Sequence, residues 1–239
     1  MKNVVAIMQR ELLSLFCSPI GYIVMAGFLL ITGISVYMTD SFAPGKPATL
    51  RDVFFWTPWV LTVVVPAISM RAISEEYRSG TIETLMTAPL SDLQMVLGKY
   101  LASLVFYLIM LAPTLIYVVL MEVYGNPDLG AMLSAYIGLV LVGVAFTAFG
   151  IFASSLTSNQ VIAWFLGWVP LLLLACLAYF LVGRVSGVLR QIFQQVNIFN
   201  RFSEFSRGLV STDGVVFFLA VAGFFLFLTV KVVESRRWR

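Results

Sequence analysis

The sequence predicts an all-α integral membrane protein with six transmembrane helices. Hydrophobic residues make up 60% of the 239 residues and charged residues only 11%, and the mean hydropathy of +0.96 is far above that of a soluble domain. The apolar residues are grouped into stretches of about 20, the length that a helix needs to cross the hydrocarbon core. Short amphipathic segments lie between or before these stretches. We therefore expect a single transmembrane domain over residues 1–239.

The N-terminal segment, residues 1–16, is predicted to form an amphipathic elbow helix in the membrane interface. Its apolar side chains share one helical face, with polar side chains opposite: Val4, Val5, Met8, Leu12, Leu15 and Phe16 against Asn3, Arg10 and Ser14. Ser18 and Pro19 then interrupt the pattern, which favours a separate helix. The alternative is that this helix extends the first span.

The predicted spans are close to bilayer length and lie at residues 20–38, 53–70, 100–120, 132–152, 161–182 and 215–230. Placing the N-terminus in the cytoplasm puts most of the fifteen basic residues on the cytoplasmic side, in agreement with the positive-inside rule. Both termini are then cytoplasmic. We expect the protein in the cytoplasmic (inner) membrane of a bacterium.

The long loop between the second and third spans, residues 71–99, is predicted to form two helices that meet at a corner. Gly80 and Thr81 begin a short helix with an apolar face, and Pro89 ends it because the residue before a proline avoids the helical region. Ser91 begins the next helix, with Gln94 completing a capping box. A short helix at this place is well positioned to be pushed by a partner, although it could also be an ordinary amphipathic loop helix.

The loop between the last two spans, residues 183–214, is predicted to contain a second pair of short helices on the outer side. Apolar side chains share one face of its first part, namely Val188, Leu189, Ile192, Phe193 and Val196. Phe199, Phe202 and Phe205 follow at three-residue spacing. Two interpretations stay open, an outer gate and an interfacial helix pair that only anchors the fifth and sixth spans.

The segment 71–99 resembles the signature of ABC-2 type permeases, in which acidic residues precede an S-G-T-hydrophobic-E-T-L run, a proline and a later G-K pair. The matching positions here are Glu75, Glu76, Ser79 to Leu85, Pro89, Gly98 and Lys99. The resemblance extends over nearly the whole chain, from the elbow helix to the ending SRRWR. Within the family, the stretch NRFSEFSRGLVSTDG is most similar to permeases associated with gliding motility and with maturation of nitrous-oxide reductase.

The resemblance implies the permease subunit of an ATP-driven ABC exporter, which is not itself an enzyme. Residues 71–99 would be the coupling segment that docks on a separate ABC ATP-binding subunit, and ATP and Mg²⁺ would bind to that subunit, with no cofactor bound to this chain. The residues implied to form or brace this contact are Glu75, Glu76, Arg78, Gly80, Thr81, Glu83, Thr84 and Leu85.

The resemblance also implies a dimer and an outer gate. A second permease copy or a paralogue would pair with the chain to enclose the translocation path, so that homodimer and heterodimer are both open. An accessory membrane or periplasmic subunit is open as well, and membrane lipids surround the spans. In ABC-2 permeases the last outer connection forms re-entrant helices, which here would place gate residues at Ile192, Phe193, Phe199, Phe202 and Phe205.

Several classes of function are excluded by residues that the chain lacks. It contains no histidine, so Cys17 and Cys176 cannot belong to a Cys/His metal cluster and no Ser/His/Asp triad can form. The G-x-x-x-x-G stretch that begins at Gly125 is followed by Ala131 and Met132 where a nucleotide-binding loop requires lysine and serine or threonine. The sequence also has no basic stripe of the kind that would indicate nucleic-acid binding.

Two alternatives to an exporter subunit remain. A carrier driven by an ion gradient would need ionisable residues inside its spans, which are nearly free of charge. A non-transporting membrane scaffold, such as an assembly factor, would share the apolar spans. Such a scaffold has no evident need for a segment that docks on an ATPase.

Overall fold

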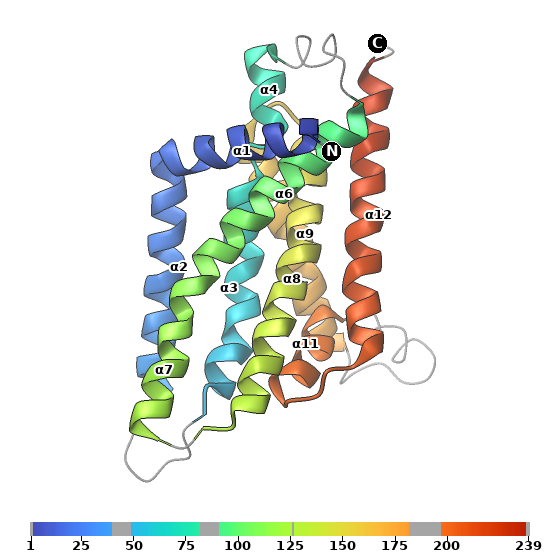
Figure 1. Cartoon of the computed structure of the whole chain (residues 1–239). Helices are drawn as coiled ribbons and strands as arrows, with labels where there is room; N and C mark the ends of the chain where they lie inside the picture. Colours follow the sequence, from blue (N-terminus) through green and yellow to red (C-terminus); the bar gives the residue numbers. More distant parts are fainter. Residues whose placement is uncertain (1, 40–48, 82–90, 126, 182–196, 238–239) are drawn as a thin grey trace.

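The computed structural model describes residues 2–39, 49–81, 91–125, 127–181 and 197–237, which form helices and contain no strand. The helices are α1 (Lys2–Cys17), α2 (Pro19–Met38), α3 (Arg51–Ser69), α4 (Ser74–Ser79), α6 (Asp92–Leu111), the 3-10 helix η1 (Ala112–Thr114), α7 (Leu115–Tyr124), α8 (Leu129–Leu156), α9 (Gln160–Leu181), α11 (Ile198–Ser206) and α12 (Thr212–Arg237). The long helices run side by side, and α1 lies across one end of the bundle (Figure 1). The helix α4 and the end of α12 lie at the same end, opposite α11.

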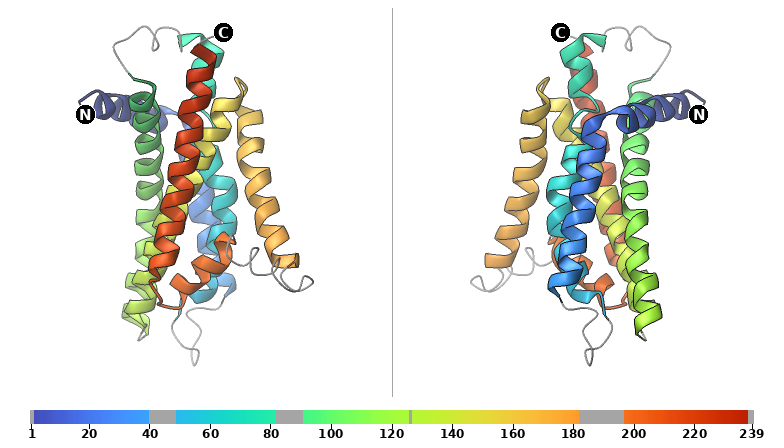
Figure 2. Two further views of the ribbon diagram at one scale, coloured as in Figure 1. Left: turned by 90° about the vertical axis from the view of Figure 1, so that its right-hand side faces the viewer. Right: turned by 90° about the vertical axis from the view of Figure 1, so that its left-hand side faces the viewer.

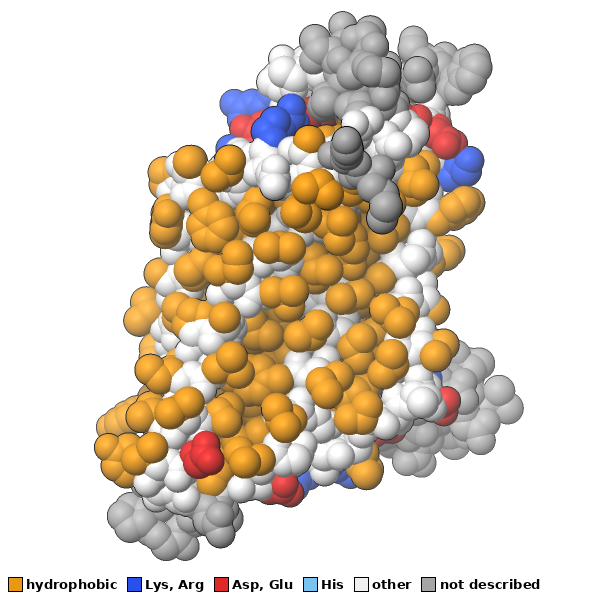
Figure 3. Space-filling model, viewed as in Figure 1, with side chains coloured by type: hydrophobic (Ala, Val, Ile, Leu, Met, Phe, Trp, Pro, Cys, Tyr) orange, Lys and Arg blue, Asp and Glu red, His pale blue; other side chains and the backbone are white. Residues whose placement is uncertain are grey.

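The described residues contain five helical stretches that are long and apolar enough to cross a membrane. They are Pro19–Met38, Arg51–Ser79, Asp92–Tyr124, Leu129–Leu156 and Thr212–Arg236, and a shorter apolar stretch, Gln160–Cys176, belongs to α9. On the face in Figure 3, charged side chains lie at the two ends and hydrophobic side chains cover the region between them. This distribution is that of a multi-pass membrane protein.

The first two helices are separate because the chain turns sharply between them. Ser18 has extended backbone angles (φ −88°, ψ 131°), and Pro19 occupies the first turn of α2, where a missing N–H costs nothing. The helix α1 packs along the first half of α6, with Ile7 buried against Gly98. A Cβ atom at position 98 would come within 2.7 Å of Ile7, so a glycine is required for this close approach.

The third predicted span is longer than expected and is not uniform. Its helix begins at Asp92, since the predicted capping box is present: Gln94 N donates to Ser91 Oγ at 3.2 Å, and Ser91 N donates to the Gln94 side chain. The helix tightens into η1 at Pro113, which has no N–H for an α-helical hydrogen bond. It then continues as α7 to Tyr124.

The helix α8 forms the centre of the bundle, and α3, α6, α9, α11 and α12 all pack on it. It is buried along most of its length, whereas α2 and α12 leave large apolar faces exposed. Figure 2 shows α6 and α9 at opposite sides of this centre. The fully buried Tyr107 of α6 packs its ring against Gly143 of α8 and donates its hydroxyl to Leu139 O at 2.8 Å.

Replacing Gly143 by alanine is expected to destabilise the bundle. A Cβ atom there would overlap the Tyr107 ring, with Cδ1 only 2.6 Å away, and overpacking of this kind costs about 1–3 kcal/mol. The measurement is the temperature at which the purified protein loses its monodisperse peak in size-exclusion chromatography. Gly27→Ala is the matched control, because nothing lies within 4 Å of a Cβ atom at position 27. Equal melting temperatures for the two variants would contradict the packing at Gly143.

Candidate functional site

The chain leaves α3 through a corner that is fixed to the end of α8. Ser154 of α8 is fully buried, and its Oγ accepts hydrogen bonds from Ile73 N at 3.1 Å and Ser74 N at 3.0 Å. The same hydroxyl donates to Met70 O at 2.8 Å. One side chain therefore satisfies three backbone groups that no helical hydrogen bond serves at this corner.

The short helix α4 projects from this corner toward the end of the bundle (Figure 1). Its base is held by Arg71, which binds Glu75 through two parallel hydrogen bonds of 2.8 and 2.9 Å and also donates to Ser18. Its tip ends at Gly80, which adopts the left-handed conformation (φ 73°) favoured at helix C-termini. Arg78, Ser79, Gly80 and Thr81 are exposed.

A buried lysine connects α4 to α1 and α6. Lys99 of α6 is only 1% exposed, and its Nζ lies 2.7 Å from Glu76 of α4 and 3.1 Å from Glu11 of α1. Arg10 completes the group with contacts of 3.2 Å to Glu76 and 2.8 Å to Glu11. We call these four residues the ion cluster. It joins three helices whose charged residues are far apart in the sequence.

The charges of the two α1 residues in the ion cluster are mutually stabilised. Burial is the largest influence on the pKa of Glu11 and raises it, but the attraction of Lys99 and Arg10 outweighs burial and holds this pKa below its ordinary value. The side-chain hydrogen bond to Glu11 raises the pKa of Arg10 above its ordinary value. Both groups are therefore ionised at neutral pH.

A fourth helix, α12, holds the other side of α4. The Arg236 guanidinium lies over the Tyr77 ring, 4.4 Å from its centroid, and donates to Leu156 O at the end of α8 at 2.8 Å. The helix α4 is thus braced by α1, α6, α8 and α12. A polar cavity of about 410 Å³ lies between α4, α1 and α6, beside the ion cluster.

The predicted ATPase-docking residues fall into two groups. Arg78, Gly80 and Thr81 are exposed at the tip of α4, and the Glu75 side chain is 44% exposed. Glu76 is buried in the ion cluster. Glu83, Thr84 and Leu85 lie outside the described residues, as does the helix predicted to follow Thr81. The docking assignment stays a prediction.

The predicted gate residues that the structure describes also fall into two groups, buried and half-buried. Phe202 and Phe205 of α11 are buried in the core, and Phe205 packs against Gly138 of α8, where a Cβ atom would come within 2.7 Å of it. Phe199 is half-buried, and its ring centroid lies 4.5 Å from that of Trp59 of α3, with the two ring planes tilted by 38°. Ile192 and Phe193 lie outside the described residues. The role of these residues as a gate stays a prediction.

Sequence reasoning missed Glu11, Ser154 and the bracing roles of Lys99 and Arg236. The resemblance did mark Gly98 and Lys99, and the structure gives this pair a physical reason: the glycine admits α1, and the lysine binds its carboxylate. Ser154 had no sequence signal, because a serine near the end of an apolar helix is common. In the described part of the chain, no three Cys, Asp or Glu residues are placed to hold a metal ion.

Comparison with known proteins gives a family match over most of the chain. Residues 57–233 match the family described as ABC-2 family transporter protein. A protein named "Probable multidrug ABC transporter permease YbhR" from Escherichia coli strain K12 is 26% identical over 101 residues, which are 42% of this chain and 27% of that relative. The protein of the same name from Escherichia coli O157:H7 gives the same values. The matched stretch thus spans about a quarter of the length of these relatives.

Proposed function

The chain belongs to the ABC-2 transporter family, and from this we propose that it is the permease subunit of an ATP-driven exporter. In this proposal, α4 and the residues after it form the contact to a separate ATP-binding subunit. The observation that carries the proposal is the bracing of α4 by four other helices, together with its exposed tip. An ordinary loop helix has no need for a buried ion cluster at its base, since a buried charge is costly unless it is paired.

The proposed mechanism uses α8 as the connection between the two ends of the bundle. Its inner end holds the α4 corner through Ser154, and its outer part supports Phe205 of α11 at Gly138. The two positions are 16 residues apart, about 24 Å along a helix. ATP binding would close the ATPase pair and displace the tip of α4, and α8 would carry that motion toward α11 and the gate residues.

The proposed topology places α1, α4 and the end of α12 in the cytoplasm. Basic residues gather at that end, including Arg10, Arg71, Arg78, Lys231 and Arg236, which suits the positive-inside rule. We take α9 as the sixth span, since it has 22 residues without a charge and donates a hydrogen bond from Trp164 to Val63 O of α3. The helix α1 is then an elbow in the interface, both termini are cytoplasmic, and the membrane is the bacterial inner membrane.

The proposed complex contains two permease subunits, identical or related, and one ATPase subunit under each, where ATP and Mg²⁺ bind. Within the family we propose the gliding-motility and nitrous-oxide-reductase-maturation subtype. The stretch that resembles it, residues 200–214, forms the end of α11 and a turn at Gly208 (φ 88°) that leads into α12. Ser211 donates to Glu204 across this turn at 2.9 Å.

Copurification with the ATP-binding subunit from the same genome tests the docking proposal. The double variant Arg78→Glu with Glu83→Arg reverses two charges in the proposed contact and leaves the ion cluster intact. We expect the tagged wild-type permease to retain the ATPase and the double variant to lose most of it, with transport in proteoliposomes lost in parallel.

The control is Glu122→Arg, a charge reversal at an exposed position at the opposite end of the bundle. This variant should retain the ATPase as the wild type does. If the double variant retains the ATPase and transports, the docking site lies elsewhere. If both variants lose the ATPase, the contact is not located at α4.

A further inference from the structure

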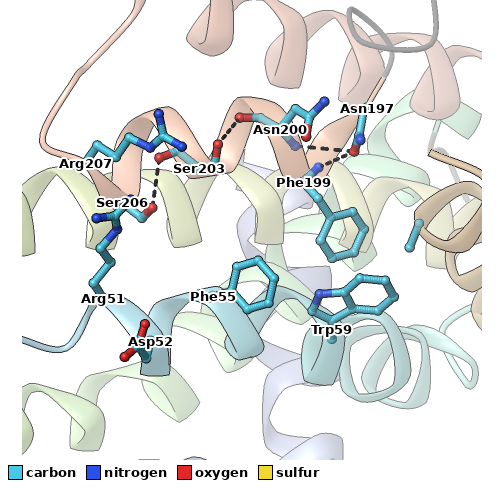
Figure 4. Close-up of a pocket in the computed structure, with 11 residues that line it drawn as sticks. Arg51, Asp52, Phe55, Trp59, Asn197, Phe199, Asn200, Ser203, Ser206 and Arg207 are labelled. Carbon is cyan, nitrogen blue, oxygen red and sulfur yellow. Dashed lines mark hydrogen bonds between the residues drawn. The ribbon is translucent and has the colours of Figure 1, made fainter. Parts of the chain in front are cut away.

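A second cavity, of about 480 Å³ and lined by both polar and apolar residues, lies at the end of the bundle opposite the ion cluster. The first turn of α3 forms one of its walls with Arg51 and Asp52, and α11 forms another with Asn200, Ser203 and Ser206 (Figure 4). Arg207 follows directly at the end of α11. None of these residues belongs to the coupling segment, and the α11 residues lie in the predicted outer segment 183–214 without being among its named gate residues.

The cavity presents two cationic groups that are available to a ligand. Arg51 and Arg207 are both exposed, and neither guanidinium has an ion pair with any described residue. Figure 4 shows Arg51 extending from α3 toward α11, where Arg207 lies. The guanidinium group binds phosphate oxygens through paired hydrogen bonds, so two of them at one cavity are suited to a phosphate group.

The remaining polar groups limit the charge of the ligand. Asp52 contributes one carboxylate, which leaves the cavity with a net charge of about +1 and disfavours a ligand with two negative charges. Ser203 and Ser206 donate to backbone carbonyls of α11 at 2.7 and 2.8 Å, so their oxygens can still accept hydrogen bonds from ligand hydroxyls. The polar part of the cavity therefore fits a phosphodiester that carries hydroxyl groups.

Three aromatic residues form most of the apolar lining, beside Ala175 of α9. The rings of Trp59 and Phe199 lie against each other, and Phe55 beside them is 51% exposed. The next residue, Trp56, is 54% exposed on the same helix, and exposed tryptophans near the ends of spans are typical of the level of lipid headgroups. A free inorganic anion gains no binding free energy from these apolar side chains. A phosphate attached to hydrocarbon chains gains it, because the chains bury apolar surface against them.

We propose that this cavity binds the headgroup of a mono-anionic membrane phospholipid. Arg51 and Arg207 hold the phosphate, the α11 hydroxyls and Asp52 accept hydrogen bonds from the headgroup, and the start of the acyl chains covers the aromatic floor. The site requires only that this end of the bundle meets a membrane surface. It therefore does not rest on the proposed ATPase contact or on transport.

Native mass spectrometry of the full-length protein, delipidated in detergent, tests the proposal. The probes are phosphatidylglycerol, phosphatidylcholine and inorganic phosphate, added separately and in competition. We expect the wild type to retain phosphatidylglycerol in preference to phosphatidylcholine. The double variant Arg51→Gln with Arg207→Gln should bind phosphatidylglycerol at least about tenfold more weakly, because it removes both guanidinium groups that would bind the phosphate.

The matched control is Arg201→Gln, which removes the same charge from α11 outside the cavity, where Arg201 lies 4.6 Å from the centroid of the Phe217 ring. It should bind the lipid as the wild type does, and circular dichroism should show the same helix content in all variants. Equal lipid binding by the double variant and the wild type would overturn the proposal. Displacement of the lipid by an equal concentration of inorganic phosphate would overturn it as well, because the site would then be one for free anions.

Discussion

Replacing Lys99 by methionine is expected to destabilise the protein by about 3–5 kcal/mol, the usual cost of removing one partner from a buried ion pair. The lysine is 1% exposed, and without it the carboxylates of Glu11 and Glu76 would face each other with only Arg10 between them. Glu76 Oε2 already has no hydrogen-bond partner among the described residues. The loss is measured as a fall in the melting temperature of the purified protein and in its yield from membranes.

Two further variants distinguish the effect of disrupting the ion cluster from the general effect of losing a lysine. Lys231→Met removes a lysine that is 55% exposed and pairs with Glu234 at the surface, so its effect should stay within about 1 kcal/mol. Combining Lys99→Met with Glu76→Gln should recover part of the stability, because it removes one of the two carboxylates that would otherwise share Arg10 as their only cationic partner in the ion cluster. A Lys99→Met protein as stable as the Lys231→Met protein would show that the ion cluster does not hold α4 in place.

The features that could be predicted from the sequence are those encoded by neighbouring residues. The capping box of Ser91 and Gln94 depends on a spacing of three, and the sequence alone predicted it correctly. The apolar stretches are equally local, because each span satisfies its own backbone hydrogen bonds. The start of α6 at Asp92 follows from this capping box, whereas hydropathy placed the start of the span only at Tyr100, since hydropathy marks where a helix is apolar and not where its hydrogen bonds begin.

The ion cluster could not be predicted, because it joins residues that are distant in the sequence. Glu11 and Lys99 are 88 positions apart, and no local pattern assigns one charge to another over such a separation. The signature marked Glu75 and Glu76 together and did not distinguish the two acidic residues. The structure separates them by burial: Glu75 lies half-exposed beside Arg71, and Glu76 is enclosed by three helices.

The end of the bundle that contains α11 illustrates the same limit for aromatic residues. The family resemblance implied one role as gate residues for Phe199, Phe202 and Phe205, which follow one another at a spacing of three. Residues that follow one another at a spacing of three do not stay on one face of a helix, because a full turn takes about 3.6 residues. The helix α11 also packs against both α8 and α3. Phe205 therefore enters the core at Gly138, while Phe199 points to the cavity beside Trp59.

Replacing Ser154 by alanine is expected to loosen α4 from α8 while leaving both helices formed. The substitution removes the acceptor of Ile73 N and Ser74 N and the donor to Met70 O, and each buried donor left unpaired costs about 1–3 kcal/mol. The helix α4 would then separate from its corner more often. The rate of tryptic cleavage after the exposed Arg78 should rise, and the melting temperature should fall.

The neighbouring Ser155 supplies the control that separates this corner from helix stability in general. Ser155 is also fully buried, but its hydroxyl donates only to Phe152 O of its own helix at 2.7 Å, so Ser155→Ala leaves no backbone donor unpaired. We expect Ser155→Ala to resemble the wild type in both assays. If Ser154→Ala also reduces transport while the ATPase still copurifies, the hydrogen bonds at Ser154 carry motion from α4 into α8. Unchanged cleavage after Arg78 in Ser154→Ala would mean that the other contacts of α4 hold it in place without Ser154.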